Sequence, residues 1–84
     1  MPTFRATIDG AEIKIDSSSF TGKEKVFFDG ELVSEKTSYL YMTVHTFNVE
    51  TNGQLDVYEV NVIAGIAGQG YVIRKNGIVM AHEP

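Results

Sequence analysis

The 84 residues are 43% hydrophobic and 21% charged, a composition that is typical of a folded globular domain and excludes a disordered tail. Seven Lys and Arg against eleven Asp and Glu give a net charge of −4, which opposes binding to nucleic acid or to an anionic membrane surface. The absence of cysteine excludes disulfides, thiolate zinc sites and a cysteine nucleophile.

The length of the chain indicates the number of domains, and the apolar runs indicate the cellular location. We expect a single domain over residues 1–84, because a chain of this size fits one compact unit. The first residues carry no basic segment followed by an apolar run, and no run approaches the roughly 20 apolar residues that cross a bilayer. We therefore expect a cytoplasmic location.

Asp-Gly and Asn-Gly pairs are the most informative local signals in the sequence. Such pairs supply the two positive φ angles of a tight hairpin turn at low cost, and β-type residues flank each of them. The pairs are Asp9-Gly10, Asp29-Gly30, Asn52-Gly53 and Asn76-Gly77. Similarity between the segments around them is loose, so we interpret them as serial hairpins rather than as a sequence repeat.

The first hairpin divides cleanly into two faces. A two-residue turn at Asp9-Gly10 puts three apolar pairs on one face: Ile8 with Ala11, Ala6 with Ile13, and Phe4 with Ile15. The other face is polar, as in a sheet with one side in water. The second hairpin is less regular, because it pairs Val26 with Val33 and Phe27 with Leu32 on opposite faces. Either both faces are partly covered or the loop at Asp29-Gly30 is longer than two residues.

The third hairpin is the longest, with arms over residues 39–50 and 55–64. A two-residue turn at Asn52-Gly53 pairs Phe47 with Tyr58, His45 with Val60, and Thr43 with Val62. The apolar positions change from even to odd numbers along the first arm. A β-bulge near His45-Thr46 would explain this change, because one extra residue exchanges the two faces.

The last part of the chain combines a glycine-rich segment with the fourth hairpin. Three glycines within residues 65–70 predict a loop or a bent strand. The turn at Asn76-Gly77 then pairs Ile73 with Met80 and Tyr71 with His82. The whole sequence predicts an all-β fold of about eight antiparallel strands, a hairpin meander that forms a small barrel or a two-layer sandwich.

A pattern of β-type residues and glycines over residues 39–79 can be compared with known families. It is carried by Thr43, His45, Phe47 and Val49, then Tyr58, Val60 and Val62, then Gly65, Gly68, Gly70, Ile73, Asn76 and Gly77. This part of the chain resembles the β-hairpin arrays of the Fas apoptotic inhibitory molecule family and of similar small bacterial proteins of unknown function. The resemblance implies a β-rich fold and a binding protein rather than an enzyme.

His45 is the candidate for chemistry, since Tyr41 and Tyr58 share its part of the predicted hairpin. Its functional interpretation is a ligand contact or a general acid and base beside a cavity. The alternative, which we favour, is a histidine packed in the sheet with its nitrogens satisfied. Two distant histidines and scattered carboxylates do not form a metal-binding pattern, so we expect no metal, no cofactor and no catalytic residue.

Residues 37–73 contain no Lys or Arg, and three aromatic or apolar side chains near their start are candidates for an exposed patch: Tyr39, Tyr41 and Met42. We therefore expect a non-catalytic β interaction module that binds a protein partner or associates with itself, for instance as a homodimer. The alternative is a small-molecule-binding protein or a small enzyme that uses a cavity near His45, Tyr41 and Tyr58.

Overall fold

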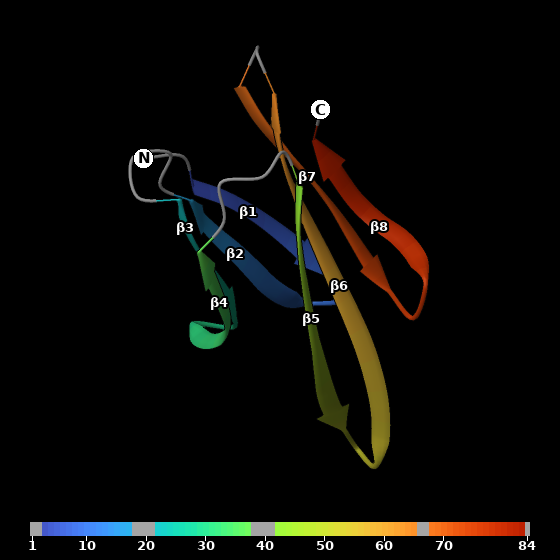
Figure 1. The fold of residues 1–84 in the computed structure, drawn as a ribbon. Coiled ribbons are helices and arrows are strands. Elements are labelled where there is room, and N and C mark those ends of the chain that lie inside the picture. Colours follow the sequence, from blue (N-terminus) through green and yellow to red (C-terminus); the bar gives the residue numbers. More distant parts are fainter. Residues whose placement is uncertain (1–2, 18–21, 38–41, 66–67, 84) are drawn as a thin grey trace. The chain divides into compact units, whose positions relative to one another are not determined.

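The computed structural model describes residues 3–17, 22–37, 42–65 and 68–83, and all of its elements are β-strands. They pair antiparallel in two four-stranded sheets, with the orders β1-β2-β3-β4 and β5-β6-β7-β8 (Figure 1). The strands are β1 (Thr3–Ile8), β2 (Ala11–Ser17), β3 (Lys23–Phe28), β4 (Glu31–Thr37), β5 (Met42–Thr51), β6 (Gln54–Gly65), β7 (Gly68–Lys75) and β8 (Ile78–Glu83). The predicted all-β fold of eight antiparallel strands is confirmed.

The chain divides into two compact units, Met1–Leu40 and Tyr41–Pro84, and each unit contains one sheet. The meander is interrupted after β4, because β4 and β5 belong to different sheets. Eight strands in two separate sheets are not closed into one barrel, so the barrel alternative is wrong and the two-sheet alternative fits. The single domain over residues 1–84 stays a prediction.

All four turns have the backbone conformation that their sequences predict. The first residue of each pair has a φ between 49° and 52°, and the following glycine has a φ between 78° and 85°. Two successive positive φ angles define the type I′ turn, whose twist matches that of the flanking strands. Asp and Asn adopt the left-handed region more easily than other non-glycine residues, which explains their place before each glycine.

The first and third hairpins have the predicted register. Phe4 lies opposite Ile15 in the first hairpin, and His45 lies opposite Val60 in the third. The bulge predicted near His45-Thr46 is wrong, since β5 and β6 pair without a register shift from Met42 to Thr51. The apolar residues at even positions of β5 therefore lie on the opposite face from His45, and Met42 is exposed there.

The second and fourth hairpins each contain a bulge that the sequence analysis missed. Val26 pairs with Ser34 instead of Val33, and Ile73 pairs with Ala81 instead of Met80. Val33 and Met80 are thus the extra residues of β4 and β8. The same shift moves the partner of Tyr71 from His82 to Glu83. In the glycine-rich segment, β6 continues to Gly65 and pairs with Gly68 of β7, while residues 66–67 lie outside the described residues.

The two sheets are equivalent strand by strand. Ile15 at the centre of the first sheet pairs with Phe4 and Val26, and Val60 at the centre of the second pairs with His45 and Ile73. The bulges in β4 and β8 occupy the same place relative to the turn. The β5–β6 hairpin differs by its greater length at the turn. The four-stranded unit therefore occurs twice in the chain, which the loose sequence similarity did not reveal.

One face of each sheet is buried. In the first sheet this face contains Ile8, Ile13, Ile15 and Val26, and in the second it contains Phe47, Tyr58, Val60, Val62, Tyr71 and Ile73. Along β2 and β5 the buried residues alternate with exposed or half-buried ones, as the two-residue period of a strand requires. Burial of each such side chain stabilises the fold by about 1.5–3 kcal/mol.

Candidate functional site

His45 lies in the middle of β5 on the buried face of the second sheet, with a solvent exposure of 0%. Thr43 and Phe47 flank it on the same face. The equivalent position in the first sheet holds Phe4, because both residues pair with the central residue of their sheet. His45 thus occupies a position that the repeated unit otherwise fills with an aromatic side chain.

Tyr58 lies on the same face as His45, on the neighbouring strand β6. Its ring stacks on the ring of Phe47, with centroids 5.2 Å apart and planes at 6°. The ammonium group of Lys75 lies 5.9 Å from the centre of the Tyr58 ring, on the next strand. His45 and Tyr58 are diagonal neighbours across the strand pair, so the structure brings these two predicted residues together. Tyr41, the third residue of the predicted ligand site, lies outside the described residues.

Thr43 introduces a second polar group on this buried face. Its hydroxyl oxygen Oγ1 is buried and has no hydrogen-bond partner. A buried hydroxyl without a partner costs about 1–3 kcal/mol, and such groups mark positions where a small polar molecule can bind. Thr43 and His45 are the polar residues of β5 on this face, while the opposing residues of β6, Val62 and Val60, are apolar.

A polar cluster at the start of β6 joins the two turns of the second sheet, and the sequence analysis missed it. The buried Asp56 accepts hydrogen bonds from Asn76 Nδ2 at 3.0 Å and from Gln54 Nε2 at 3.4 Å. Lys75 Nζ lies 3.9 Å from the other oxygen, Oδ2. Three side chains thus satisfy one buried carboxylate, which indicates a structural role. Only the register shows that Asp56 faces Asn76, so no sequence signal identifies this cluster.

Tyr71 is a buried phenol on the same face of the second sheet. Burial raises its pKa above the ordinary value of 10.0, and the carboxylate of Glu83, its partner on β8, raises the pKa further. Both effects disfavour the charged phenolate. Tyr71 therefore stays protonated at neutral pH and acts as a packed aromatic residue rather than as a base.

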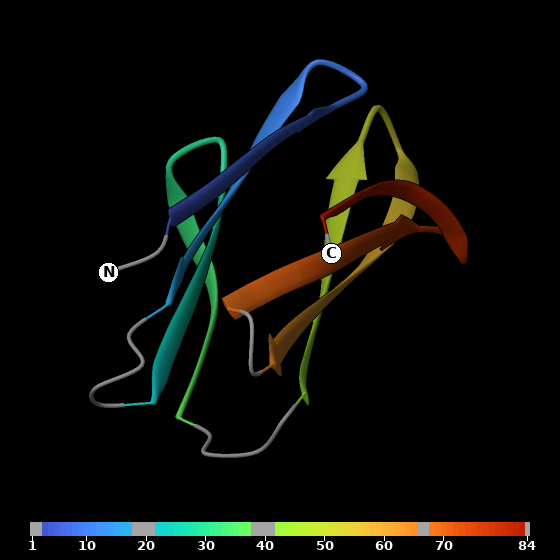
Figure 2. The ribbon, with the colours of Figure 1, turned by 90° about the horizontal axis from the view of Figure 1, so that it is seen from above.

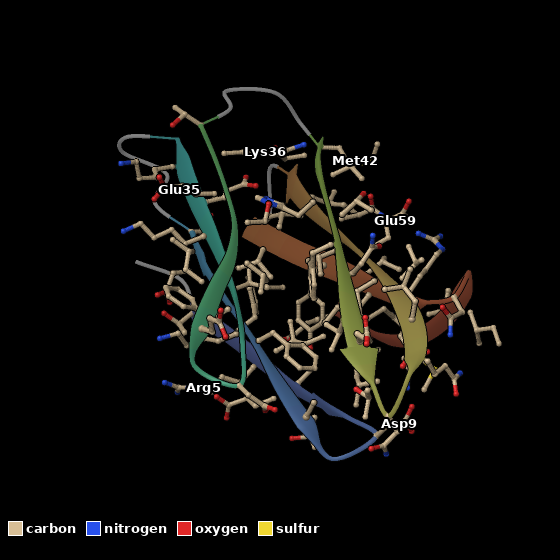
Figure 3. All side chains as sticks on the ribbon, turned by 90° about the horizontal axis from the view of Figure 1, so that it is seen from below. Arg5, Asp9, Glu35, Lys36, Met42 and Glu59 are labelled. Atoms are coloured by element: carbon tan, nitrogen blue, oxygen red, sulfur yellow. The ribbon has the colours of Figure 1, made fainter. Side chains whose placement is uncertain are left out.

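The outer face of the second sheet carries the predicted partner residue Met42. Met42 is 53% exposed and lies opposite Ile63, which is also exposed. Figure 3 labels Met42 at the start of β5 and Glu59 on β6, the neighbouring strand. The apolar side chains exposed on this face are Met42, Leu55, Val57, Ile63 and Val79. We call these five residues the outer patch. Tyr39 and Tyr41, the other predicted partner residues, lie outside the described residues.

Two charged residues in the middle of the outer face of the second sheet form an ion pair. Glu59 Oε2 lies 3.1 Å from Arg74 Nη1 and accepts a second hydrogen bond from Asn61 Nδ2 at 3.2 Å. Arg74 is the cross-strand partner of Glu59 in the register of β6 and β7. This pair leaves little net charge in the middle of the face, so the exposed apolar side chains dominate its chemistry.

The outer face of the first sheet has the opposite character. It carries charged side chains on every strand: Arg5, Glu12, Lys14, Asp16, Lys23, Lys25 and Glu35. Lys14 lies 3.6 Å from Asp16 and covers the ring of Phe27 at 4.5 Å, and Lys25 lies 3.7 Å from Glu35. Of the eight large hydrophobic residues exposed in the described part of the chain, seven lie in the second unit, and Leu32 is the exception. The repeated fold does not require this difference, since both units have the same strands and turns.

Neither searches of the structure for known kinds of site nor comparisons with other proteins assign a function to this chain. In the described ranges, no three histidine, aspartate or glutamate side chains gather closely enough to hold a metal ion. A search of the same ranges for helices with the length and apolar character of a membrane span finds none. No protein-family model, no curated protein and no solved structure matches this chain. The resemblance to the Fas apoptotic inhibitory molecule family stays a prediction.

Proposed function

We propose that this chain is a non-catalytic β interaction module, which binds a protein partner or a second copy of itself through the second unit, Tyr41–Pro84. The observation that carries the proposal is the unequal distribution of exposed apolar side chains between two equivalent sheets. Exposed apolar residues that gather on one surface mark interaction sites, because their burial against a partner removes them from water. The resemblance of residues 39–79 to a family of binding proteins agrees with this proposal.

Residues at equivalent positions of the two sheets can be compared directly. Glu12 of β2 corresponds to Val57 of β6, and Lys25 of β3 corresponds to Val72 of β7, as the two registers align them. A charged side chain at these positions is compatible with the fold, as the first sheet demonstrates. Val57 at one of the matching positions is 42% exposed, and contact with a partner is the purpose that an exposed apolar residue fits best there.

The test is native mass spectrometry of the protein purified from its own source, with two matched variants. Met42→Glu combined with Val79→Glu puts two charges into the outer patch, one on β5 and one on β8. Leu32→Glu puts a charge at the exposed apolar position of the first sheet. We expect the wild type and Leu32→Glu to carry a second chain, and the double variant to be free of it. Unchanged association of a folded double variant would contradict the proposal.

A second candidate function has one observation in its favour. The unpaired, buried hydroxyl of Thr43, next to His45 on the same face of β5, is the kind of group that a small polar ligand satisfies. In that case the chain is a small-molecule-binding protein or a small enzyme that uses His45, Tyr41 and Tyr58. The same mass spectrum distinguishes the two, because a monomer with the added mass of a small molecule supports this candidate.

A cytoplasmic location belongs to the proposal as well. Fractionation of cells that express the tagged chain tests it directly, and recovery with the soluble cytoplasmic fraction is the expected result.

A further inference from the structure

Strand β8 (Ile78–Glu83) forms one edge of the second sheet. An edge strand presents unpaired backbone N–H and C=O groups that can bind a further strand. Natural proteins oppose such pairing with charged side chains, especially lysine, with proline, or with bulges. The two edge strands β4 and β8 occupy equivalent places in the two sheets, so they can be compared residue by residue.

The comparison shows that β4 is protected by charge and β8 is not. Glu31, Glu35 and Lys36 of β4 correspond to Ile78, His82 and Glu83 of β8. Three consecutive apolar residues, Ile78, Val79 and Met80, are 65%, 48% and 41% exposed. Because neighbouring residues of a strand point to opposite faces, this segment is apolar and exposed on both of its faces.

The bulge at Met80 does not account for the difference, because β4 has its own bulge at the equivalent Val33. Figure 2 shows that β8, drawn in red, curves along its length, as a bulged strand does. The bulge belongs to the repeated fold. The loss of charge belongs to β8 alone.

We propose that β8 pairs antiparallel with β8 of a second copy of this chain and forms a symmetric dimer by strand addition. This inference rests on the proposed function, and it names both the partner and the segment that binds it. An antiparallel pair of identical strands has a two-fold axis between them, which is the commonest symmetry of homodimers. Backbone hydrogen bonds provide the pairing, and the exposed apolar side chains of the two strands cover one another.

The charges of β8 suit pairing with a second copy. The chain as a whole carries a net charge of −4, which makes two copies repel each other, but β8 adds little to this repulsion. Within β8, Glu83 at its end is the single acidic residue, and Arg74 and Lys75, beside the start of β8, are already paired with Glu59 and Asp56. An antiparallel pair keeps the two Glu83 side chains at opposite ends. The pairing therefore places no two acidic side chains opposite each other.

Single-cysteine variants test this arrangement, because the chain has no cysteine of its own. A disulfide forms only where two Cα atoms come within about 7 Å of each other. Around a two-fold axis this condition holds near one point of the strand and fails a few residues away. We therefore expect oxidative cross-linking of the full chain to peak at one or two neighbouring positions between Val79→Cys and His82→Cys. Leu32→Cys, at the equivalent and equally exposed position of β4, is the matched control and gives no dimer.

A charge in β8 provides the second measurement. Val79→Lys raises the dimer dissociation constant in sedimentation equilibrium by more than about tenfold, since lysine on an edge strand opposes pairing. Leu32→Lys leaves the dissociation constant unchanged. Val79 and Leu32 are both 48% exposed, so the two substitutions put lysine at equally exposed and equivalent positions of the two edge strands.

The outcomes separate this inference from the proposed function. Cross-linking that peaks at Met42→Cys or Ile63→Cys, or a wild-type monomer that associates with a different protein, overturns the β8 pairing and leaves the interaction module intact. Equal cross-linking at every position including Leu32→Cys also overturns the pairing, because it reports random collision. A chain that associates with nothing overturns both proposals.

Discussion

Asp29 and Asn76 make the same two hydrogen bonds in the two sheets. The backbone N–H of Asp29 donates to the carbonyl of Glu12 at 2.8 Å, and its Oδ1 accepts from the N–H of Glu12 at 2.8 Å. In the second sheet, the backbone N–H of Asn76 donates to the carbonyl of Val57 at 2.7 Å, and Asn76 Oδ1 accepts from the N–H of Val57 at 2.9 Å. Each turn residue thereby extends the pairing of its hairpin to the neighbouring hairpin, which fixes the place of the turn.

The substitutions Asp29→Asn and Asn76→Asp have unequal effects on the stability of the fold. Asp29→Asn keeps the accepting oxygen and the tolerance for positive φ, so we expect a change within about 0.5 kcal/mol. Asn76→Asp replaces the Nδ2 donor, which lies 3.0 Å from Asp56, with a second carboxylate. Repulsion between this carboxylate and the buried one of Asp56 lowers the free energy of unfolding by about 1–3 kcal/mol. Urea unfolding at neutral pH measures both changes, and equal effects would contradict the account of the cluster.

Thr43→Val stabilises the fold. The substitution removes a buried hydroxyl that has no hydrogen-bond partner and keeps the branched shape that suits a strand. We expect the free energy of unfolding to rise by about 1 kcal/mol in urea unfolding. Val44→Thr, on the other face of the same strand, is the control and is expected to give no gain. A loss of stability with Thr43→Val would mean that the hydroxyl is satisfied, for example by a bound small molecule.

His45 has a structural role under this account. His45→Ala leaves a cavity on the buried face of the second sheet, so we expect the free energy of unfolding to fall by about 2–5 kcal/mol. Association of the molecules that remain folded stays unchanged, which native mass spectrometry measures at a temperature well below the unfolding midpoint. A folded His45→Ala chain that keeps its stability and loses a bound ligand would support the small-molecule candidate instead.

The raised pKa of Tyr71 makes the fold sensitive to alkali. The phenol is neutral in the folded chain at a pH where it already ionises in the unfolded chain, whose pKa is near 10. Its contribution to stability is therefore complete below about pH 10 and is lost as the pH rises through the folded pKa. Carbon NMR of labelled tyrosine rings follows the ionisation. Glu83→Gln lowers the pKa of Tyr71 only in part, because burial is the larger cause.

The turns and the two regular hairpins were predictable from the sequence, since Asp-Gly and Asn-Gly determine the turn type and the alternation of apolar residues determines the register. The bulges at Val33 and Met80 were not, because either register leaves an apolar residue opposite an apolar or small one. The bulge expected near His45 was wrong because the even apolar residues of β5 are not core residues: Met42 is exposed and Val44 is half-buried. Because a histidine is usually not a core residue, the pattern of apolar residues did not identify the face of His45 as the buried face.

The candidate surface was predictable only at Met42. Its neighbour Ile63 and the exposed segment from Ile78 to Met80 read as core residues in the sequence, because apolar residues in strands are usually buried. Their exposure becomes evident only when the strands are placed in a sheet and β8 lies at its edge. The contrast with the charged strand β4 depends on the repeat, which the sequence hides.

NMR spectra of the uniformly labelled chain, recorded over a series of dilutions, test the central claim that the second unit carries the interaction surface. We predict that amide shifts change on dilution in β8 and on the strands that carry the outer patch, while the amides of β1 to β4 keep their positions. Changes confined to the first sheet, or changes spread evenly over both sheets, would contradict the claim.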